Sequence, residues 1–300
     1  MEEIPIELGT APDLTGLDSE LVSHETYDEV ALNLSRRATS DPDDDRPPTP
    51  PSNKILRCNA KHIFSTFNAR TLAPVGRLDE LLFCCEQYST EILAIQEHRF
   101  YHPDEPIRTT MHGNHQLITS SCCKNSINAS VGGIGVLLSA KVKDCLTLAE
   151  SISPRIMLLE FLGNPKLTVI CVYSPHNESP EEDVDQFYSD LRSVLDRVPP
   201  HNFLSLMGDF NAKLGPDSVN FTFNDHTNRN GEKLFDLMEE YNLFSANNYF
   251  MKPKSHLWTY ESPKGDRSQL DYMLFRKSGR IVFIIPDLSP LSLLALIIEL

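Results

Sequence analysis

Polar side chains that could do chemistry recur where apolar runs end in this 300-residue sequence. They are carboxylates, carboxamides, a phenol and an imidazole, most of them at the end of a β-like run or just after it. These residues are Asn68, Glu97, Tyr173, His176, Asp209, Asn211 and Asp271. If the run ends share one edge of a sheet sandwich, the set provides carboxylates for Mg²⁺ and for a water molecule, with neutral donors for a phosphate. The pattern predicts metal-assisted phosphodiester hydrolysis.

Each of these positions also allows a plainer interpretation. The Asp209 and Asn211 pair in LMGDFNAKLG is typical of a turn, because Asp and Asn side chains hydrogen-bond to their own backbone. Glu97 is equally consistent with a solvated strand end, and Tyr173 with the rim of a core. The order and type of the surrounding secondary-structure elements distinguish the two interpretations.

Short apolar runs alternate with amphipathic stretches from about residue 54 onward. The runs predict strands at 62–70, 91–99, 132–140, 156–163, 166–176, 203–211 and 268–276. The amphipathic stretches predict helices at 76–89, 179–198 and 230–243, the second with Ser179 as its N-cap. Several strand runs are too continuously apolar for a half-exposed sheet. We therefore expect a four-layered α/β sandwich, with two packed mixed sheets flanked by helices.

Composition divides the chain into three parts. Residues 1–53 hold 13 Asp or Glu against three Arg and end in a proline-rich acidic run, so a disordered leader is expected there. Residues 54–277 form the predicted domain. Residues 278–300 are an apolar tail in which 281–285 suits a buried strand and 291–298 a poorly packed helix. The run 291–298 is far shorter than the roughly 20 apolar residues of a membrane helix.

Charge and cysteine usage limit the protein class. The leader accounts for most of the formal net charge of −15, so the body lacks the basic surface of a module that binds nucleic acid through phosphates alone. Seven cysteines, four of them in adjacent pairs, suit neither a disulfide framework nor a zinc site. With an N-terminus unlike a signal peptide, we expect a monomer in the nucleus or cytoplasm, neither secreted nor bound to a membrane.

A family resemblance covers about residues 61–277. The strings FNARTL, QEHR, YSPH, GDFN, WTY and SQLDY, in this order, resemble the endonuclease/exonuclease/phosphatase superfamily. More narrowly, IQEHR, YSPH, GDFNAKLG, NRNGEKL and RSQLDYMLFR resemble the endonuclease domains of RTE-type non-LTR retrotransposons and the related craniofacial development protein 2-like proteins. The resemblance implies a DNA substrate and a Mg²⁺ cofactor, with Mn²⁺ as the alternative.

The resemblance also implies a role for each matching position. Glu97 and Asn68 would lie at the metal, with Glu97 as the principal ligand. Asp209, Asn211, Tyr173 and Asp271 would be catalytic, Asp209 by orienting the attacking water and Asp271 by orienting a histidine. The substrate-binding residues would be His176, Asn230 and Trp258. Asn230 also fits an ordinary turn before a helix, and Trp258 also fits a packing role.

One family feature is missing from the sequence. The family ends in a Ser-Asp-His segment whose histidine binds the phosphate, but no histidine follows His256 here. We therefore expect a truncated or replaced last strand and impaired catalysis. Three functions stay open: a Mg²⁺-dependent DNA endonuclease of retrotransposon origin, a non-catalytic remnant of one, and a phosphatase of the same superfamily.

Overall fold

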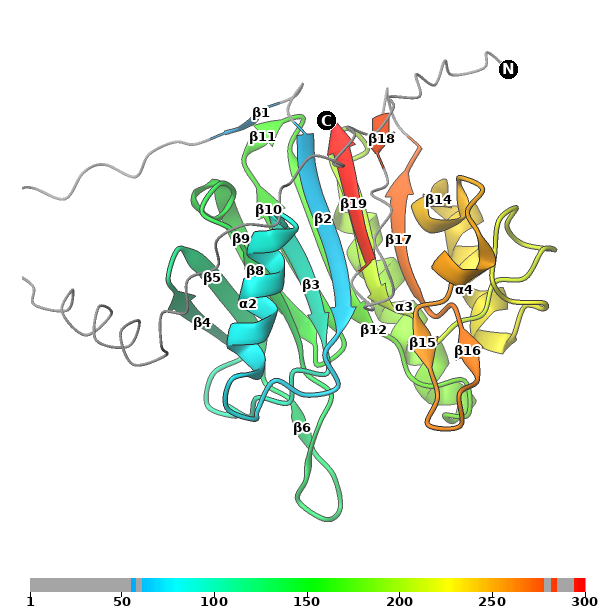
Figure 1. The fold of residues 1–300 in the computed structure, drawn as a ribbon, viewed down its shortest axis with the longest axis horizontal. Helices are drawn as coiled ribbons and strands as arrows, with labels where there is room; N and C mark the ends of the chain where they lie inside the picture. Colours follow the sequence, from blue (N-terminus) through cyan, green and yellow to red (C-terminus); the bar gives the residue numbers. More distant parts are fainter. Residues whose placement is uncertain (1–54, 58–60, 278–281, 285–293, 300) are drawn as a thin grey trace, which may run out of the picture. The chain divides into compact units, whose positions relative to one another are not determined.

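Two mixed β-sheets stack face to face in the computed structural model, which describes residues 55–57, 61–277, 282–284 and 294–299 (Figure 1). The seven-stranded sheet has the order β18-β19-β2-β3-β8-β5-β4. Its strands are β2 (Lys61–Asn68), β3 (Ile92–Gln96), β4 (Ile107–His112), β5 (His115–Ser120), β8 (Ile134–Leu138), β18 (Val282–Ile284) and β19 (Leu294–Glu299). The buried strand β3 lies near its centre, as its uninterrupted apolar run predicts.

The six-stranded sheet has the order β14-β17-β13-β12-β10-β9. Its strands are β9 (Leu146–Ser153), β10 (Ile156–Phe161), β12 (Leu167–Tyr173), β13 (Phe203–Asp209), β14 (Leu243–Ser245) and β17 (Asp271–Arg276). Every residue of β12 and β13 is buried. Inner strands covered on both faces explain why these runs are apolar throughout.

Short pairs and turns complete the described elements. β1 (Leu56–Arg57) pairs with β11 (Gly163–Asn164), β6 (Cys123–Lys124) with β7 (Ser130–Val131), and β15 (Tyr260–Glu261) with β16 (Arg267–Ser268). The 3₁₀ turns are η1 (Lys143–Cys145), η2 (Ala246–Asn248) and η3 (Lys254–His256). The hairpins formed by β6–β7 and β15–β16 project from the same end of the sandwich (Figure 1).

Helices cover the outer face of each sheet. The helices are α2 (Arg77–Gln87), α3 (Glu181–Arg197) and α4 (Arg229–Glu240). One hydrophobic cluster joins α2 to the seven-stranded sheet, another joins α3 and α4 to the six-stranded sheet, and a third lies between the sheets. The predicted four-layered sandwich is therefore confirmed.

The helix starts follow local chemistry, with one correction. Asn228 caps α4, because its side chain accepts a hydrogen bond from the Gly231 N–H at 2.8 Å. The predicted cap of α3, Ser179, is wrong. Pro180 occupies that position and makes no side-chain cap, because its ring carries no hydrogen-bonding atom; the acidic first turn complements the helix dipole instead.

The tail agrees with one expectation and corrects another. Residues Val282–Ile284 join the seven-stranded sheet as β18, as predicted. A helix was expected over residues 291–298, but Leu294–Glu299 form β19 and pair antiparallel with β2. An open edge on β2 offers ladder hydrogen bonds, and these override the ambiguous periodicity of a short apolar run. The leader of residues 1–53 lies outside the described residues.

Strand register brings three predicted site residues into one row. Tyr173 at the end of β12 pairs with Asp209 on β13, and Asp209 pairs with Asp271 on β17. Partners in register present their side chains on the same face of a sheet. In the facing sheet, Asn68 ends β2 and Glu97 follows β3 directly. Within the described part of the chain, no helix is long and apolar enough to cross a membrane.

Candidate functional site

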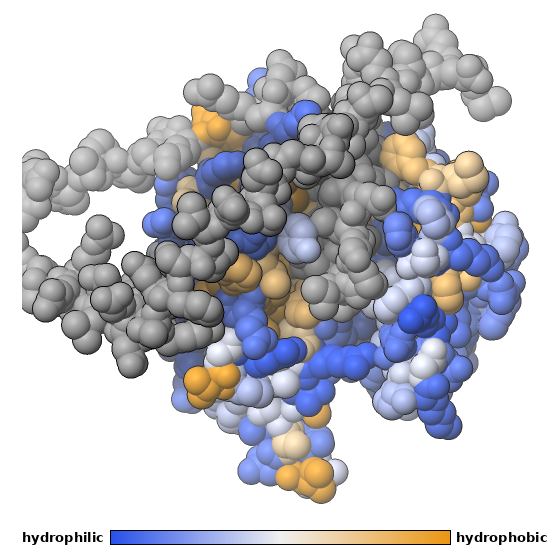
Figure 2. Space-filling model, viewed as in Figure 1, coloured by the Kyte–Doolittle hydropathy of each residue, from blue (hydrophilic) through white to orange (hydrophobic). Residues whose placement is uncertain are grey.

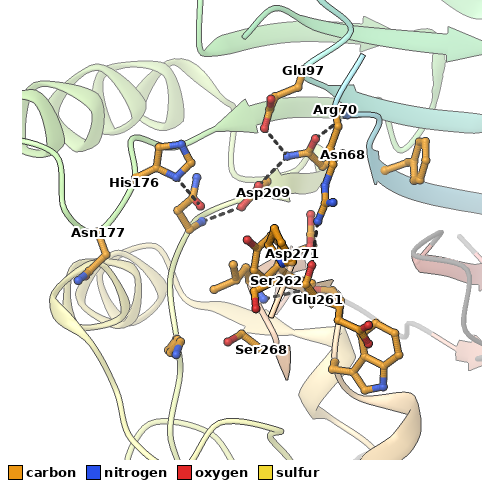
Figure 3. A pocket seen from close by; sticks show the side chains of 18 of the residues that line it. Asn68, Arg70, Glu97, His176, Asn177, Asp209, Glu261, Ser262, Ser268 and Asp271 are labelled. Atoms are coloured by element: carbon orange, nitrogen blue, oxygen red, sulfur yellow. Dashed lines mark hydrogen bonds between the residues drawn. The ribbon is translucent and has the colours of Figure 1, made fainter. Parts of the chain in front are cut away.

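A pocket of about 940 Å³ opens at the end of the sandwich where β2, β3, β13 and β17 carry these polar residues (Figure 3). Seven of the nine predicted site residues line it. They are Asn68, Glu97, His176, Asp209, Asn211, Trp258 and Asp271. The predicted convergence of strand-end side chains is therefore present in the structure, although their roles remain predictions.

Asn68 links the two sheets through its carboxamide. Its Nδ2 donates to Glu97 Oε1 at 3.0 Å and to Asp209 Oδ2 at 2.9 Å (Figure 3). Its Oδ1, which we predicted as a metal ligand, accepts a hydrogen bond from the Arg70 backbone N–H at 3.0 Å. Asn68 therefore acts here as a spacer that holds two carboxylates close together.

The surroundings of Glu97 favour its ionised form. Besides Asn68, Tyr173 donates its hydroxyl to Glu97 Oε1 at 3.0 Å, and the Arg99 guanidinium lies 2.9 Å from Oε2. Burial alone would raise the pKa of Glu97, but these hydrogen bonds outweigh it and lower the pKa below its usual value. The result is a fixed carboxylate at the pocket wall.

Tyr173 contacts Glu97 from the core between the two sheets. It does not line the pocket but belongs to the core between the sheets, and the Arg155 guanidinium lies 5.2 Å from its ring centre. Burial and the negative charges of Glu97 and Asp209 raise the pKa of Tyr173, so its phenol stays protonated and keeps donating. Its predicted contact with a phosphate would require Glu97 to release the hydroxyl.

Asp209 and Asp271 form a pair of buried like charges. They face each other in the β13–β17 ladder, where like charges repel. Burial raises the pKa of Asp209, and the neighbouring Glu97 charge adds to the rise. Burial and the Asp209 charge raise the pKa of Asp271 well above its usual range. The pair therefore favours a proton or a cation beside it.

Asp271 has one carboxylate oxygen that could bind such a cation. Its backbone is held at both ends, because its N–H donates to Thr259 Oγ1 at 3.1 Å and its carbonyl accepts from Asn247 Nδ2 at 3.0 Å. Its buried Oδ1 has no hydrogen-bond partner among the described residues. A buried polar atom without a partner costs free energy, so a ligand that satisfies it is favoured.

His176 and Asn211 form the far wall. His176 Nδ1 lies 3.1 Å from Asn211 Oδ1, and the Asn211 side-chain amide donates to the Ser174 carbonyl at 2.9 Å. The Asn211 backbone N–H donates to Asp209 Oδ1 at 2.8 Å. Asn211 thus fixes both the aspartate and the imidazole, and the exposed His176 is the group that can face a ligand.

Asn230 is not part of the pocket wall. Its side chain is fully buried, and its Nδ2 donates to the carbonyls of Pro175 at 3.0 Å and Asn211 at 3.2 Å. The structure therefore does not support the predicted contact between Asn230 and a substrate. Instead, Asn230 ties together the two loops that carry His176 and Asp209.

Trp258 lies half-buried at the pocket rim before the β15–β16 hairpin. The Arg267 guanidinium lies 4.4 Å from its ring centre, a cation–π contact. Arg70 makes a similar contact at 5.3 Å with Tyr260, and it donates to the Glu261 carbonyl at 3.1 Å. The hairpin is thus fastened to the end of β2.

The backbone is strained around the site. Of the seven non-glycine residues with positive φ in the described chain, four lie here: Arg70, Glu97, Arg99 and Asn211. Such conformations cost free energy and cluster at functional sites. Just before Asp209, Gly208 has a φ of 152°, and a Cβ there would lie 2.0 Å from the Val172 carbonyl oxygen. Only glycine allows β12 and β13 to approach this closely.

Three residues at the site received no role from sequence reasoning. Arg70 and Asn177 line the pocket, and Arg99 pairs with Glu97. Arg70 and Arg99 each stand two positions after a predicted site residue, within the strings FNARTL and QEHR. That spacing was the available signal, because a residue that follows a strand end stays near it.

The donor set suits a hard cation that keeps much of its water. In the described part of the chain, no three His, Cys, Asp or Glu side chains are grouped as a metal cage. Mg²⁺, however, is typically held by one or two carboxylates together with substrate oxygens and water. The partnerless Oδ1 of Asp271 and the crowded carboxylates fit such an ion.

The chain is similar in sequence to curated relatives. No family model matches it. Craniofacial development protein 2 from Tragulus javanicus and from Bos taurus are each 28% identical to it over 234 residues. That match covers 76% of this chain and 39% and 38% of the two relatives, so the chain spans well under half of their length.

Solved structures with the same fold are nucleases and phosphatases. The 3′ phosphatase NExo from Neisseria, bound to a product DNA hairpin, has a TM-score of 0.57 and 14% identity, covering 79% of this chain and 98% of that one. AP endonuclease LMAP from Leishmania major has a TM-score of 0.58 and 11% identity, covering 79% and 87%. A Leptotrichia buccalis protein of the endonuclease/exonuclease/phosphatase family has a TM-score of 0.54 and 13% identity, covering 80% and 99%. The chain therefore has the endonuclease/exonuclease/phosphatase fold and is similar in sequence to craniofacial development protein 2.

Proposed function

We propose that the pocket hydrolyses phosphodiester bonds in DNA with the help of Mg²⁺, with Mn²⁺ as a substitute. The observation that carries this proposal is that Glu97 and Asp209, bridged by Asn68, line one open pocket together with Asp271. Three carboxylates from two sheets repel each other unless a cation or a proton lies among them. The DNA-processing proteins of the same fold support the choice of substrate.

Each side chain has a role set by its geometry. Asp209 is anchored through both carboxylate oxygens, by Asn68 and by the Asn211 N–H, so it can hold and deprotonate a water molecule in one orientation. Glu97, with Asn68 beside it, would hold the metal ion, and Asp271 Oδ1 would complete its surroundings. The ion would supply charge stabilisation to the phosphate oxygens. His176 and Asn177, on the opposite wall, would contact the phosphate.

We expect the hydrolysis to be slow. The terminal histidine that the family resemblance implies has no match in the sequence, and the Asp271 carboxylate that would orient it keeps an Oδ1 without a partner among the described residues. Losing one group that stabilises the transferring phosphate typically costs about 10²- to 10³-fold in rate. We further propose that this domain derives from an RTE-type retrotransposon, on the strength of the strings IQEHR, YSPH and RSQLDYMLFR.

The test is cleavage under single-turnover conditions. A labelled DNA duplex and a supercoiled plasmid are incubated with excess protein in Mg²⁺, Mn²⁺ or EDTA. Slow metal-dependent nicking is expected, and free imidazole in the buffer should accelerate it. Glu239→Gln, on the exposed face of α4, is a matched control that should cut like the original chain. Rapid nicking in EDTA would contradict the proposal.

A second candidate is a remnant that binds DNA without cutting it. The unsatisfied Asp271 favours it, because the same missing partner that slows hydrolysis could abolish it. Metal-dependent DNA binding with no cleavage, even with imidazole, would identify this case. The third candidate, a phosphatase, predicts faster release of phosphate from a 3′-phosphorylated oligonucleotide than cutting of the duplex.

A further inference from the structure

The seven-stranded sheet ends on one side at β4, whose outer edge has no strand beside it among the described residues (Figure 1). Free N–H and C=O groups along such an edge can pair with a strand from another chain. Proteins usually protect their sheet edges with short strands, bulges or charged side chains. An edge without such protection is therefore a candidate interface.

The other edges of the two large sheets are protected. The edge strands β14 and β18 are three residues long each. The edge strand β9 has two register shifts against β10, and its Glu150 pairs with Arg197 at 2.6 Å. Short length, irregular pairing and charge each discourage the addition of a strand.

The edge strand β4 lacks these features. It is six residues long, contains no proline, lysine or glycine, and pairs with β5 without a register shift. Its charged side chain, Arg108, already pairs with Glu105 at 2.9 Å. Thr109, Thr110 and Met111 are exposed. Of the described edges of the large sheets, β4 is thus the one that best accepts another strand.

The turn after β4 shows which of its backbone groups point outward. His112 and His115, on either side of this two-residue turn, are paired in register. In a two-residue hairpin this pair exchanges hydrogen bonds, and the direction of the backbone groups alternates along the strand. The even-numbered residues of β4 therefore direct their N–H and C=O groups to β5. Those of Ile107, Thr109 and Met111 point to the open edge.

A second copy of β4 fits this edge in one antiparallel register. A two-fold axis perpendicular to the sheet keeps the same face of both copies on one side, so odd residues oppose odd residues. With the axis at Thr109, this residue opposes its own copy, and Ile107 opposes Met111. All outward backbone groups of β4 are then paired. An axis at Arg108 would oppose two like charges, and an axis at Thr110 would leave Ile107 beside the turn.

The same register matches the side chains. Ile107 packs against the core between the sheets, and Met111, on the same face of β4 by alternation, is 51% exposed. Pairing would place each Met111 beside the Ile107 of the other copy and extend the apolar face. On the described part of the face in Figure 2, hydrophobic side chains lie singly or in small groups among hydrophilic ones. That face offers no broad apolar patch, which makes edge pairing the better candidate.

We propose that two copies of this chain form a dimer through antiparallel pairing of their β4 strands, with the two-fold axis at Thr109. This dimer replaces the monomer that we expected from the sequence, and it joins two sheets into one continuous sheet. No residue of β4 lines the pocket, so both pockets stay open, and the inference is independent of the proposed hydrolysis. Two paired six-residue strands bury less area than a standard interface, so the dimer is weak.

Sedimentation equilibrium of the full chain, from about 2 to about 200 μM, tests the dimer. The average mass of the original chain should rise towards that of a dimer. Thr109→Pro should stay monomeric, because it removes an N–H that pairs across the axis and none that pairs with β5. Circular dichroism checks that this variant folds. Met251→Lys, at an 81% exposed residue outside β4, is the control and should dimerise like the original chain.

A charge exchange tests the register and does not depend on the proline variant. Thr109→Lys and Thr109→Asp each place two like charges at the axis and should weaken the dimer about fivefold or more. An equimolar mixture of the two should dimerise at least as well as the original chain, because a lysine then opposes an aspartate. The same exchange at the exposed Thr147 on β9 should change nothing.

Three results would overturn the proposal. The first is an original chain that stays monomeric at about 200 μM, a concentration at which even a weak interface is populated. The second is a folded Thr109→Pro variant that dimerises like the original chain. The third is a mixture of Thr109→Lys and Thr109→Asp that dimerises no better than either variant alone.

Discussion

Two glutamates flank strand β3, the buried Glu91 before it and the half-buried Glu97 after it, and the two ends differ in how the charge is neutralised. Before β3, Glu91 lies 2.7 Å from His62 Nδ1 and accepts a hydrogen bond from Lys141 Nζ at 3.0 Å. After β3, Glu97 shares the donor Asn68 with a second carboxylate, Asp209. We call the Glu91 end of β3 the closed end, because one acid there contacts two basic side chains. We call the Glu97 end the open end, because several acids there line an open pocket.

The pKa directions express the same difference. At the closed end, burial opposes ionisation of Glu91, but hydrogen bonds from His62 and Lys141 outweigh it and lower its pKa. At the open end the pKa of Glu97 is lowered too, but those of Asp209 and Asp271 are raised by burial and by neighbouring acids. The closed end therefore stabilises the fold. The open end accumulates negative charge that a cation or a proton can relieve.

The largest expected effect concerns chemistry at the open end. Asp209→Asn removes the anchored base and should lower the single-turnover cleavage rate by about 10²-fold or more, with little change in thermal stability. Glu91→Ala should leave the rate per folded molecule unchanged, because Glu91 lies at the other end of β3. An equal loss of rate in both variants would remove the distinction between the two ends.

The next effect is on stability at the closed end. Glu91→Ala leaves the buried His62 without its partner, and breaking a buried, hydrogen-bonded pair costs roughly 2–3 kcal/mol. Denaturant unfolding followed by circular dichroism measures this change. Glu105→Ala, which breaks an exposed pair with Arg108, is the control and should leave the midpoint unmoved. A loss in Glu91→Ala no larger than in this control would show that the closed end contributes nothing.

Both glutamates were visible in the sequence, but only one attracted attention. Glu97 stands after an apolar run, and its place at the end of that run together with the string QEHR marked it. Glu91 begins the same run and was passed over, because its partner His62 is 29 residues away and only strand pairing brings them together. The inward-facing row of Tyr173, Asp209 and Asp271 likewise depends on register, which periodicity does not specify.

The errors have physical causes of the same kind. Asn230 stood in a turn-like string, and only tertiary packing shows that its amide bonds two buried carbonyls. The run Leu294–Glu299 suits a helix or a strand equally well, and pairing with the edge of β2 makes it a strand. The local sequence pattern thus predicted the layers of the fold and the edge where the pocket lies. It could not predict hydrogen bonds between residues distant in sequence, which only the structure shows.

A smaller effect should appear when pH is varied. A pKa below the ordinary 4.5 means that the folded chain favours the Glu91 carboxylate. Its stabilising contribution is complete above that pH and is lost as the pH falls through the lower, folded-state pKa. The difference in unfolding free energy between the original chain and Glu91→Ala should therefore be constant near neutral pH and shrink below about pH 4.5. A difference that grows on acidification would reverse the assigned sign.

The smallest effect is expected from the metal ion, and it addresses the open end directly. Mg²⁺ should bind weakly, because the described residues offer no dedicated cage and the ion keeps most of its water. At a concentration equal to its dissociation constant, a ligand that binds only the folded chain stabilises it by about 0.4 kcal/mol. Thermal unfolding in increasing Mg²⁺ should show this gain in the original chain and in Glu91→Gln. Glu97→Gln should show a smaller gain at every concentration, because it removes the ligand but keeps the side-chain shape. Equal gains in Glu97→Gln and the original chain would exclude Glu97 as the ligand, and the crowding of acids in the pocket would then need another explanation.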